Sequence, residues 1–348
     1  MRHSTWRNDI IRGMSQAEPK NKNRWIFLFV ASVGLLAFYC ILMLNAKYDE
    51  LSRYPYTDQK SRQLIRDHLN EQEIDYIIEY SIAPNMFVAY IQEEGFNIYH
   101  ASEYKRLSEF AWQEPPGHIV QMVEETIDIM SIDTLIEYLG GYRYDELHDF
   151  LVFGDRYIPG SQLLMGAQAI DTYVDSQVTL GIRKPTYLVR LDTETIPAAR
   201  EGILVDPRVS EDLAALCAAA ADETGSPRAC AGMVITDGYI SYDEQKLRHE
   251  ADANMPYPGH SEHQLGLAVD FGMPGLLPAY FRDTMQYGWL KDNAWRFGFV
   301  ETWNRADEVI TGIPQEAWHF RYVGTELAAK LHNEGNSFAR YATAKRGE

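Results

Sequence analysis

The sequence is poor in positive charge. Its 348 residues include 32 Lys and Arg against 50 Asp and Glu, and the formal net charge is −18. Proteins that bind nucleic acid use clustered Lys and Arg to displace counterions from the phosphates. No basic stripe interrupts the acidity of this chain, so its composition argues against nucleic acid as a partner.

Cysteine is scarce as well, with three residues in the whole chain. Cys40 lies in an apolar run, whereas Cys217 falls on a predicted helix and Cys230 just before a predicted strand. In an oxidising compartment the last two could form a disulfide, but buried free thiols are also common. The spacing alone leaves both alternatives open.

One stretch near the N-terminus lacks charge altogether. Residues 25–44 are twenty consecutive uncharged and mostly apolar residues, long enough as a helix to cross a hydrocarbon core of roughly 30 Å. A cleaved signal peptide is the alternative, but its apolar run usually has about 7–15 residues and ends at a small-x-small site. No such site follows this run. We therefore expect an uncleaved transmembrane anchor.

The charges that flank the anchor predict its orientation. Residues 1–24 contain six Lys or Arg and two acidic residues. Basic flanks stay on the cytoplasmic side of a membrane. We therefore expect a single-pass protein of the cell membrane with a cytoplasmic basic tail at residues 1–24. Everything after Lys47 is expected to lie outside the cytoplasm.

Two different patterns follow the anchor. Residues 45–160 repeat apolar positions at steps of three and four, which predicts an extracytoplasmic helical region. This region has no ligand or nucleophile spacing, and a spacer role is the simplest interpretation. From residue 185 to residue 345 short β-like runs alternate with helices, which predicts a second domain.

Turn and cap signals divide this second domain into elements. Asp206 and Pro207 are a good N-cap and first helical residue, and Gly225 is a good stop. Ser241 and Glu244 have the spacing of a capping box at the start of another helix. The expected strands are 232–236, 266–272 and 317–324, and the expected later helices are 284–299 and 325–335.

Two of the ten histidines lie in dense polar surroundings, His263 in HSEHQLGLAVDFG and His319 in EAWHFRYVG. A catalytic zinc site needs about three His or carboxylate ligands and an open position. His263, Asp270 and His319 supply that set. Asp270 lies in an otherwise apolar strand, where a charge is costly unless it is paired or bound to metal. Satisfied core histidines and a turn-capping Asp are the alternative, but they leave Glu316 unexplained.

Glu316 precedes His319 by three residues, so the two side chains would point to opposite faces of one continuous strand. Pro314 favours a strand that begins only after Glu316. The carboxylate is then free to project into the site without binding the metal. We expect Glu316 to act as general base on the water that the metal activates and later to protonate the leaving amine.

The same residues carry a family resemblance. SEHQLGLAVD and EAWHFRYVG resemble the SxHxxGxAxD and ExWHxRYVG patterns of the VanY-type D-alanyl-D-alanine carboxypeptidases, which are LAS metallopeptidases. The likeness runs from about residue 187 to residue 331. It implies an α+β fold with a small antiparallel sheet flanked by helices, and a zinc (Zn2+) D,D-carboxypeptidase that releases the terminal D-Ala of peptidoglycan stem peptides.

The resemblance also implies roles for particular residues. It makes His263, Asp270 and His319 the zinc ligands and Glu316 the base. It further places four residues at the substrate groove or metal pocket: Ser241, Gln245, Ser261 and Trp318. For Ser241 a helix N-cap is an equally good interpretation.

One departure from the pattern bears on activity. Relatives have an Arg in a GYRS stretch that faces the scissile carbonyl, whereas this chain has Ile240 in GYIS. The loss of one oxyanion donor typically costs about 10²–10³ in rate. Arg321 and Lys246 are the candidate replacements. The alternatives are an L,D-carboxypeptidase or endopeptidase on cell-wall peptides, or a catalytically weakened protein that binds or regulates the wall.

Overall fold

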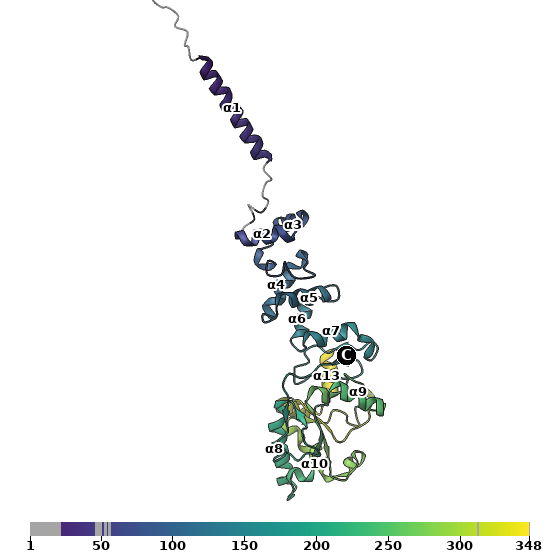
Figure 1. The fold of residues 1–348 in the computed structure, drawn as a ribbon. Helices are drawn as coiled ribbons and strands as arrows, with labels where there is room; N and C mark the ends of the chain where they lie inside the picture. The colour runs from purple at the N-terminus through teal and green to yellow at the C-terminus, as the bar shows by residue number, and fades with distance from the viewer. Residues whose placement is uncertain (1–21, 46–50, 52–53, 55–56, 312, 348) are drawn as a thin grey trace, which may run out of the picture. The chain divides into compact units, whose positions relative to one another are not determined.

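The structure, a computed structural model, describes residues 22–45, 51, 54, 57–311 and 313–347. The chain divides into two compact units, Met1–Gln92 and Glu93–Glu348. Figure 1 colours them in chain order. Most of the predicted basic tail falls on residues 1–21, outside the described residues. The prediction for that tail is therefore untested.

The first unit is helical. A long apolar helix begins it, and N-caps define the next two helices. Asp58 accepts hydrogen bonds from the backbone N–H groups of Lys60 and Ser61, and Asn70 forms a capping box with Glu73. The elements of this unit are α1 (Lys22–Asn45), α2 (Gln59–His68), α3 (Glu71–Glu79) and the 3₁₀ helix Pro84–Met86.

Helix α1 contains the predicted anchor. Its segment Asn23–Leu44 is long and apolar enough to cross a membrane, and none of it is buried against the rest of the protein. An N-terminal signal sequence would have the same length and composition. The apolar helix is thus confirmed, and its membrane topology stays a prediction.

The second unit begins with short helices, as the apolar periodicity predicts. Proline and glycine separate two of these helices from their neighbours, because Pro115 and Pro116 open α5 and Gly140 follows α6. These elements are the 3₁₀ helix Ile98–His100, α4 (Ala101–Phe110), α5 (Pro116–Thr126), α6 (Ile132–Leu139), α7 (Tyr144–Val152) and the 3₁₀ helix Gly154–Arg156.

These helices and the segment that follows them belong to one compact unit. The buried carboxylate of Glu146 in α7 accepts a hydrogen bond from the backbone N–H of Lys184. Arg183 donates one to the carbonyl of Gly141. The predicted domain boundary between residues 160 and 185 lies within this unit and stays a prediction.

A four-stranded antiparallel sheet organises the rest of the unit. Its strand order is β5-β6-β8-β7, with two small two-stranded sheets beside it, one parallel (β1 with β2) and one antiparallel (β3 with β4). This arrangement confirms the expected α+β fold. The strands are β1 (Gln162–Leu163), β2 (Val178–Thr179), β3 (Val189–Arg190), β4 (Leu204–Val205), β5 (Val234–Asp237), β6 (Ala268–Gly272), β7 (Phe299–Val300) and β8 (His319–Tyr322).

Helices flank this sheet. Asp206 caps the first of them, and Pro207 is its first residue, as predicted. They are α8 (Pro207–Glu223), α9 (Tyr242–Ala251), α10 (Met285–Asn293), α11 (Glu308–Thr311), α12 (Thr325–Glu334) and α13 (Phe338–Arg346). Four 3₁₀ helices join them: Ala229–Gly232, η6 (Glu262–Leu265), Pro278–Asp283 and Ala294–Phe297.

Helix α13 was not predicted from the sequence. Its residues Phe338, Ala339 and Ala342 are buried in a core cluster with Tyr173 and Val323. The short segment FARYATAKR offers only a weak helical pattern of its own. Packing against residues distant in the chain, rather than local periodicity, therefore accounts for this helix.

Gly266 determines where the central strand begins. Its φ is +72°, and a Cβ there would lie 2.8 Å from Leu188 Cδ2 and 3.1 Å from the backbone nitrogen of Asp206. Only glycine accommodates both the left-handed backbone and this close approach. The turn shortens the strand expected at 266–272 to β6, and it leaves His263 on η6.

The structure also resolves the cysteine alternatives. Cys217 on α8 and Cys230 in the 3₁₀ helix before β5 form a disulfide, and both are buried. Cys40 is a free, exposed cysteine on α1. The disulfide links α8 to the segment that enters the sheet.

Candidate metal centre

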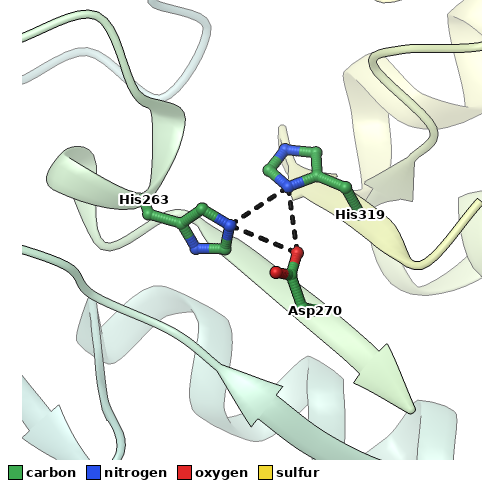
Figure 2. A group of neighbouring side chains, drawn as sticks. All are labelled: His263, Asp270 and His319. Atoms are coloured by element: carbon green, nitrogen blue, oxygen red, sulfur yellow. Dashed lines mark hydrogen bonds and ion pairs between the residues drawn. The ribbon is translucent and has the colours of Figure 1, made fainter. Parts of the chain in front are cut away.

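Three predicted ligands converge at one point of the sheet. His263 comes from η6, Asp270 from β6 and His319 from β8. Asp270 and His319 are direct partners in the antiparallel register, so their side chains share a face. One ligand atom from each residue lies within 4.8 Å of the other two, as Figure 2 shows.

The three polar atoms face one another closely. Asp270 Oδ1 lies 3.2 Å from His263 Nε2 and 3.1 Å from His319 Nδ1. The two imidazole nitrogens are themselves 3.2 Å apart. The site is thus a compact triangle of two nitrogens and one carboxylate oxygen.

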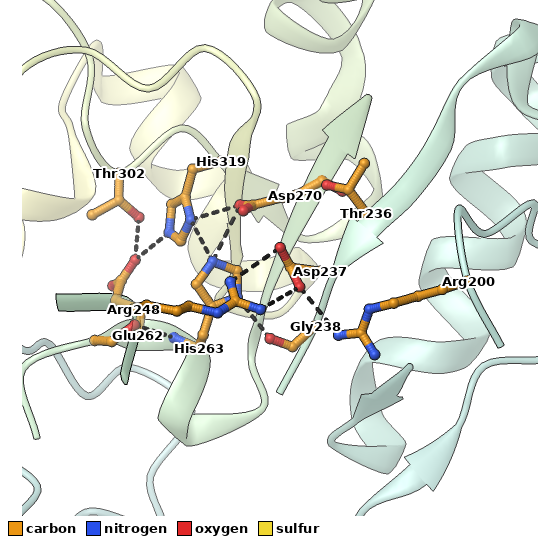
Figure 3. Close-up of polar contacts among 11 residues, drawn as sticks. Arg200, Thr236, Asp237, Gly238, Arg248, Glu262, His263, Asp270, Thr302 and His319 are labelled. Atoms are coloured by element: carbon orange, nitrogen blue, oxygen red, sulfur yellow. Dashed lines mark hydrogen bonds and ion pairs between the residues drawn. The ribbon is translucent and has the colours of Figure 1, made fainter. Parts of the chain in front are cut away.

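The outer nitrogens of the two imidazoles define their tautomers. His263 Nδ1 lies 2.7 Å from the carbonyl oxygen of Gly238, and His319 Nε2 lies 3.0 Å from Glu262 Oε2 (Figure 3). Both partners accept hydrogen bonds, so each outer nitrogen donates a proton. In the neutral imidazoles His263 Nε2 and His319 Nδ1 therefore present lone pairs to Asp270. Three converging acceptors are stabilised by a positive charge between them, which is either a bound cation or a proton added to an imidazole.

The electrostatics of the site agree with this conclusion. Burial lowers the pKa of His319, but hydrogen bonds to Asp270 and Glu262 outweigh it and raise the pKa to about 10. Burial also raises the pKa of Asp270, yet His263 and His319 hold it below its ordinary value. The surroundings thus favour a positive charge at the centre. Two imidazoles and a carboxylate are also the ligand types of a catalytic zinc site.

Glu316 lies beside this group without joining it. Strand β8 begins at His319, which confirms the prediction that the strand starts after Glu316. The backbone N–H of Glu316 donates to the carbonyl of Trp303, and its own carbonyl accepts from the N–H of His319. Burial raises the pKa of the Glu316 carboxyl to about 7. A group with such a pKa can both accept and donate a proton near neutrality.

A cavity of about 480 Å³ exposes the centre. His263, Asp270 and Glu316 line it, whereas His319 is completely buried. A substrate in this cavity would therefore contact both the metal position and the proposed base.

The four predicted substrate-binding residues occupy different places. Gln245, Ser261 and Trp318 line the cavity. Gln245 is held by a hydrogen bond to the carbonyl of Pro256. Ser241 is not among the described residues that line it, and its hydroxyl accepts from the N–H of Glu244 as the N-cap of α9. The structure thus supports the capping interpretation of Ser241, while the roles of the other three stay predictions.

Sequence reasoning missed the residues that support His319. Glu262 is completely buried, and its Oε2 accepts hydrogen bonds from His319 and from the Thr302 hydroxyl at 2.8 Å. Trp303 stacks on the His319 ring, with 4.1 Å between the ring centres. An acidic residue directly before a candidate histidine ligand was the available signal for Glu262. Thr302 and Trp303 lie in a loop about forty residues after Glu262, so no local sequence pattern indicated their contacts with the site.

The structure excludes both candidate replacements for the arginine that Ile240 displaces. Arg321 is completely buried, donates to the carbonyls of Ile170, Thr172 and Tyr322, and lies 3.6 Å from Glu262 Oε1. Lys246 lines a separate surface hollow with Arg156 and Tyr257. Neither is among the described residues that line the cavity of the metal centre.

The contact between Glu262 and His319 leads to a test. In Glu262→Gln the amide can still accept from His319 Nε2, but the negative charge is lost. Such partners of metal-binding histidines typically contribute about 10–100-fold to metal affinity. We expect zinc affinity, measured by chelator competition, to fall within this range.

Two controls accompany Glu262→Gln. The surface change Glu223→Gln removes an ion pair with Arg296 and alters a hydrogen bond from Trp289. It should leave zinc affinity unchanged. The melting temperature of the metal-free protein separates a loss of affinity from a loss of folding. Unaltered zinc affinity in a folded Glu262→Gln protein would contradict the supporting role of Glu262.

Comparison with known proteins finds relatives of the part of the chain that holds the metal centre. The family model described as "VanY: D-alanyl-D-alanine carboxypeptidase" matches residues 202–325. A D-alanyl-D-alanine carboxypeptidase of Enterococcus faecalis is 37% identical over 105 residues, which are 30% of this chain and 38% of that protein. One from Enterococcus faecium is 37% identical over 110 residues, 31% of this chain and 35% of the relative. The chain thus spans well under half the length of these curated relatives.

Solved structures show the same similarity. The vancomycin-resistance D,D-pentapeptidase VanY from a VanB-type cassette, solved in complex with Zn(II), is 28% identical with a TM-score of 0.40, over 49% of this chain and 98% of that one. The LD-carboxypeptidase LdcB is 27% identical with a TM-score of 0.46, over 53% and 90%. Both predicted motifs lie within the residues that the family model matches. Residues 202–325 of this chain are therefore similar to the VanY family of D-alanyl-D-alanine carboxypeptidases.

Proposed function

We propose that this protein is a zinc-dependent D,D-carboxypeptidase that hydrolyses the terminal D-Ala from peptidoglycan stem peptides. The observation that supports this most is the convergence of two imidazole lone pairs and the Asp270 carboxylate beside the partly buried carboxylate of Glu316. The curated relatives named above have this activity in their names. All three candidate ligands and the candidate base are present.

Metal binding and proton transfer fall to different residues of the chain. His263, Asp270 and His319 would hold the zinc, which when bound polarises a carbonyl and makes water more acidic. Glu316, with a pKa raised by burial to about 7, takes a proton from the attacking water. It then gives that proton to the nitrogen of the leaving D-Ala, so the C–N bond breaks without a free amide anion.

The proposed location agrees with this substrate. Helix α1 would anchor the protein in the cytoplasmic membrane with its second unit outside, where stem peptides are found. The Cys217–Cys230 disulfide supports an oxidising compartment.

The direct experiment incubates the full-length protein, purified in detergent, with a stem pentapeptide that ends in D-Ala-D-Ala. We expect mass spectrometry to show loss of one D-Ala, its suppression by a chelator and its recovery with zinc. Retention of the pentapeptide together with shortening of a tetrapeptide would indicate an L,D-carboxypeptidase. If neither peptide is cleaved under zinc-replete conditions, the protein is not a carboxypeptidase.

A further inference from the structure

The cavity of the metal centre has one basic side chain. Among the described residues that line it, Arg248 is the single Lys or Arg, while Asp237, Asp270 and Glu316 are acidic. Ile240, at the position where relatives have an arginine, also lines the cavity but is apolar and buried. Among the described residues that line this cavity, the permanent positive charge therefore comes from Arg248.

Arg248 is held in place by two carboxylates. From α9 its NH1 and NH2 groups donate to the two oxygens of Asp237 at 3.2 and 3.0 Å, and NH2 donates to Glu244 at 2.7 Å. A guanidinium has five N–H groups, so two remain without a partner among the described residues. The side chain is 31% exposed. Arg248 is thus rigidly oriented and still able to bind an anion.

The strand register places this arginine beside the metal position. Asp237 on β5 is the register partner of Asp270 on β6, across a local irregularity of the strand. Directly opposite residues have side chains on one face, with Cβ atoms about 4.5–5.5 Å apart. Figure 3 shows Asp237 next to Asp270, with Arg248 reaching it from α9 and Arg200 from the segment before β4. The guanidinium of Arg248 is therefore held by the strand next to Asp270, and it lines the same cavity as the metal position.

This position in the same cavity suits the end of a peptide chain. A carboxypeptidase cleaves the bond before the last residue, so the free carboxylate lies one residue from the scissile carbonyl, within about 3.8 Å between adjacent Cα atoms. A planar guanidinium binds a carboxylate well. Nearby cavity residues such as Met273, Leu276 and Leu277 are apolar and would suit a methyl side chain.

We propose that Arg248 binds the terminal carboxylate of the substrate and thereby makes this site specific for free C-termini. The inference rests on the proposed function and deepens it. Asp237 is a positioning residue that orients the guanidinium. Arg200 also donates to Asp237 at 3.2 Å, but it is 49% exposed and is not among the described residues that line the cavity.

The test compares two substrates on full-length protein. One is a stem pentapeptide with a free C-terminal carboxylate, and the other is the same peptide as a C-terminal amide. A hydrogen-bonded charge pair typically contributes about 10- to 100-fold to binding. In Arg248→Met we expect KM for the free acid to rise by that factor, with kcat within about threefold of wild type. Cleavage of the amide should change little.

Arg200→Met is the matched control, because it removes the other arginine from Asp237 and leaves the cavity intact. It should keep the preference for the acid. Arg248→Lys should keep part of the preference that Arg248→Met loses, since Lys has the positive charge but not the planar guanidinium that donates two parallel hydrogen bonds. An equal loss on acid and amide, or a loss in kcat alone, would show that Arg248 acts on the reacting carbonyl or on folding. Either result overturns the proposal.

A binding measurement separates this inference from the proposed function. Calorimetry on Glu316→Gln, with and without Arg248→Met, reports the affinity for the acid and the amide in the absence of turnover. A preference for the acid that disappears with Arg248→Met supports carboxylate binding even if the wild type hydrolyses nothing. If the Glu316→Gln protein that keeps Arg248 binds the acid and the amide equally well, the inference is overturned.

Discussion

Replacement of Glu316 with Gln is expected to lower the rate of terminal D-Ala release by about 10²–10⁴-fold, the usual contribution of a general acid–base group. Gln has nearly the same shape but cannot accept a proton from water or pass it to the leaving nitrogen. Glu316 does not belong to the triangle of candidate ligands, so the variant should keep its zinc. The measurement is kcat/KM on the stem pentapeptide together with metal content.

A matched control exists for this change. Glu301 is also a partly buried carboxyl with a pKa raised by burial. It accepts hydrogen bonds from Tyr287 and Gln315, however, and it lines a different cavity. Glu301→Gln should stay within a few-fold of wild type. If Glu316→Gln retains more than about one tenth of wild-type activity, Glu316 is not the base. A loss of less than about tenfold is too small for an acid–base group.

Asp270→Asn is expected to abolish tight zinc binding. Its carboxylate is the one negative charge among the three candidate ligands, and it faces both imidazoles at 3.1–3.2 Å. A carboxamide has no net charge and is a poorer ligand. The loss of affinity should therefore exceed the roughly 10–100-fold that residues outside the ligand set contribute. Metal analysis after dialysis, followed by chelator competition, measures it.

Asp237→Asn is the control for metal content. Asp237 is the partner of Asp270 in the neighbouring strand and lines the same cavity, but its carboxylate binds Arg248 and Arg200 instead of the two histidines. That variant should retain zinc. Full zinc occupancy of Asp270→Asn would contradict the assignment of the centre and, with it, the proposed function.

Local sequence was sufficient for the main elements and for the candidate metal residues. The periods of the apolar positions, the N-cap at Asp206 and the stop at Gly225 depend on neighbours within a few residues, so the sequence displays them directly. His263 and Asp270 lie seven residues apart on a turn and the strand it enters. Their convergence follows from that short connection.

The charge at the substrate cavity could not be predicted in the same way. Arg321 and Lys246 were plausible because a motif shows residue types and not where long side chains end. Arg321 is on the same strand as His319, yet its guanidinium is buried among backbone carbonyls. Arg248 reaches the cavity because Asp237, eleven residues earlier, binds it.

By itself the sequence determined the apolar helix and the residues that meet at the metal centre, because these depend on local composition and on short motifs. The α+β class followed from the resemblance that the same motifs carry. The tertiary structure decided which groups surround that centre. The contacts of Glu262 with Thr302, of Trp303 with His319 and of Cys217 with Cys230 join segments that are separate in the chain. Such contacts arise from strand order and packing, which local residue patterns do not encode.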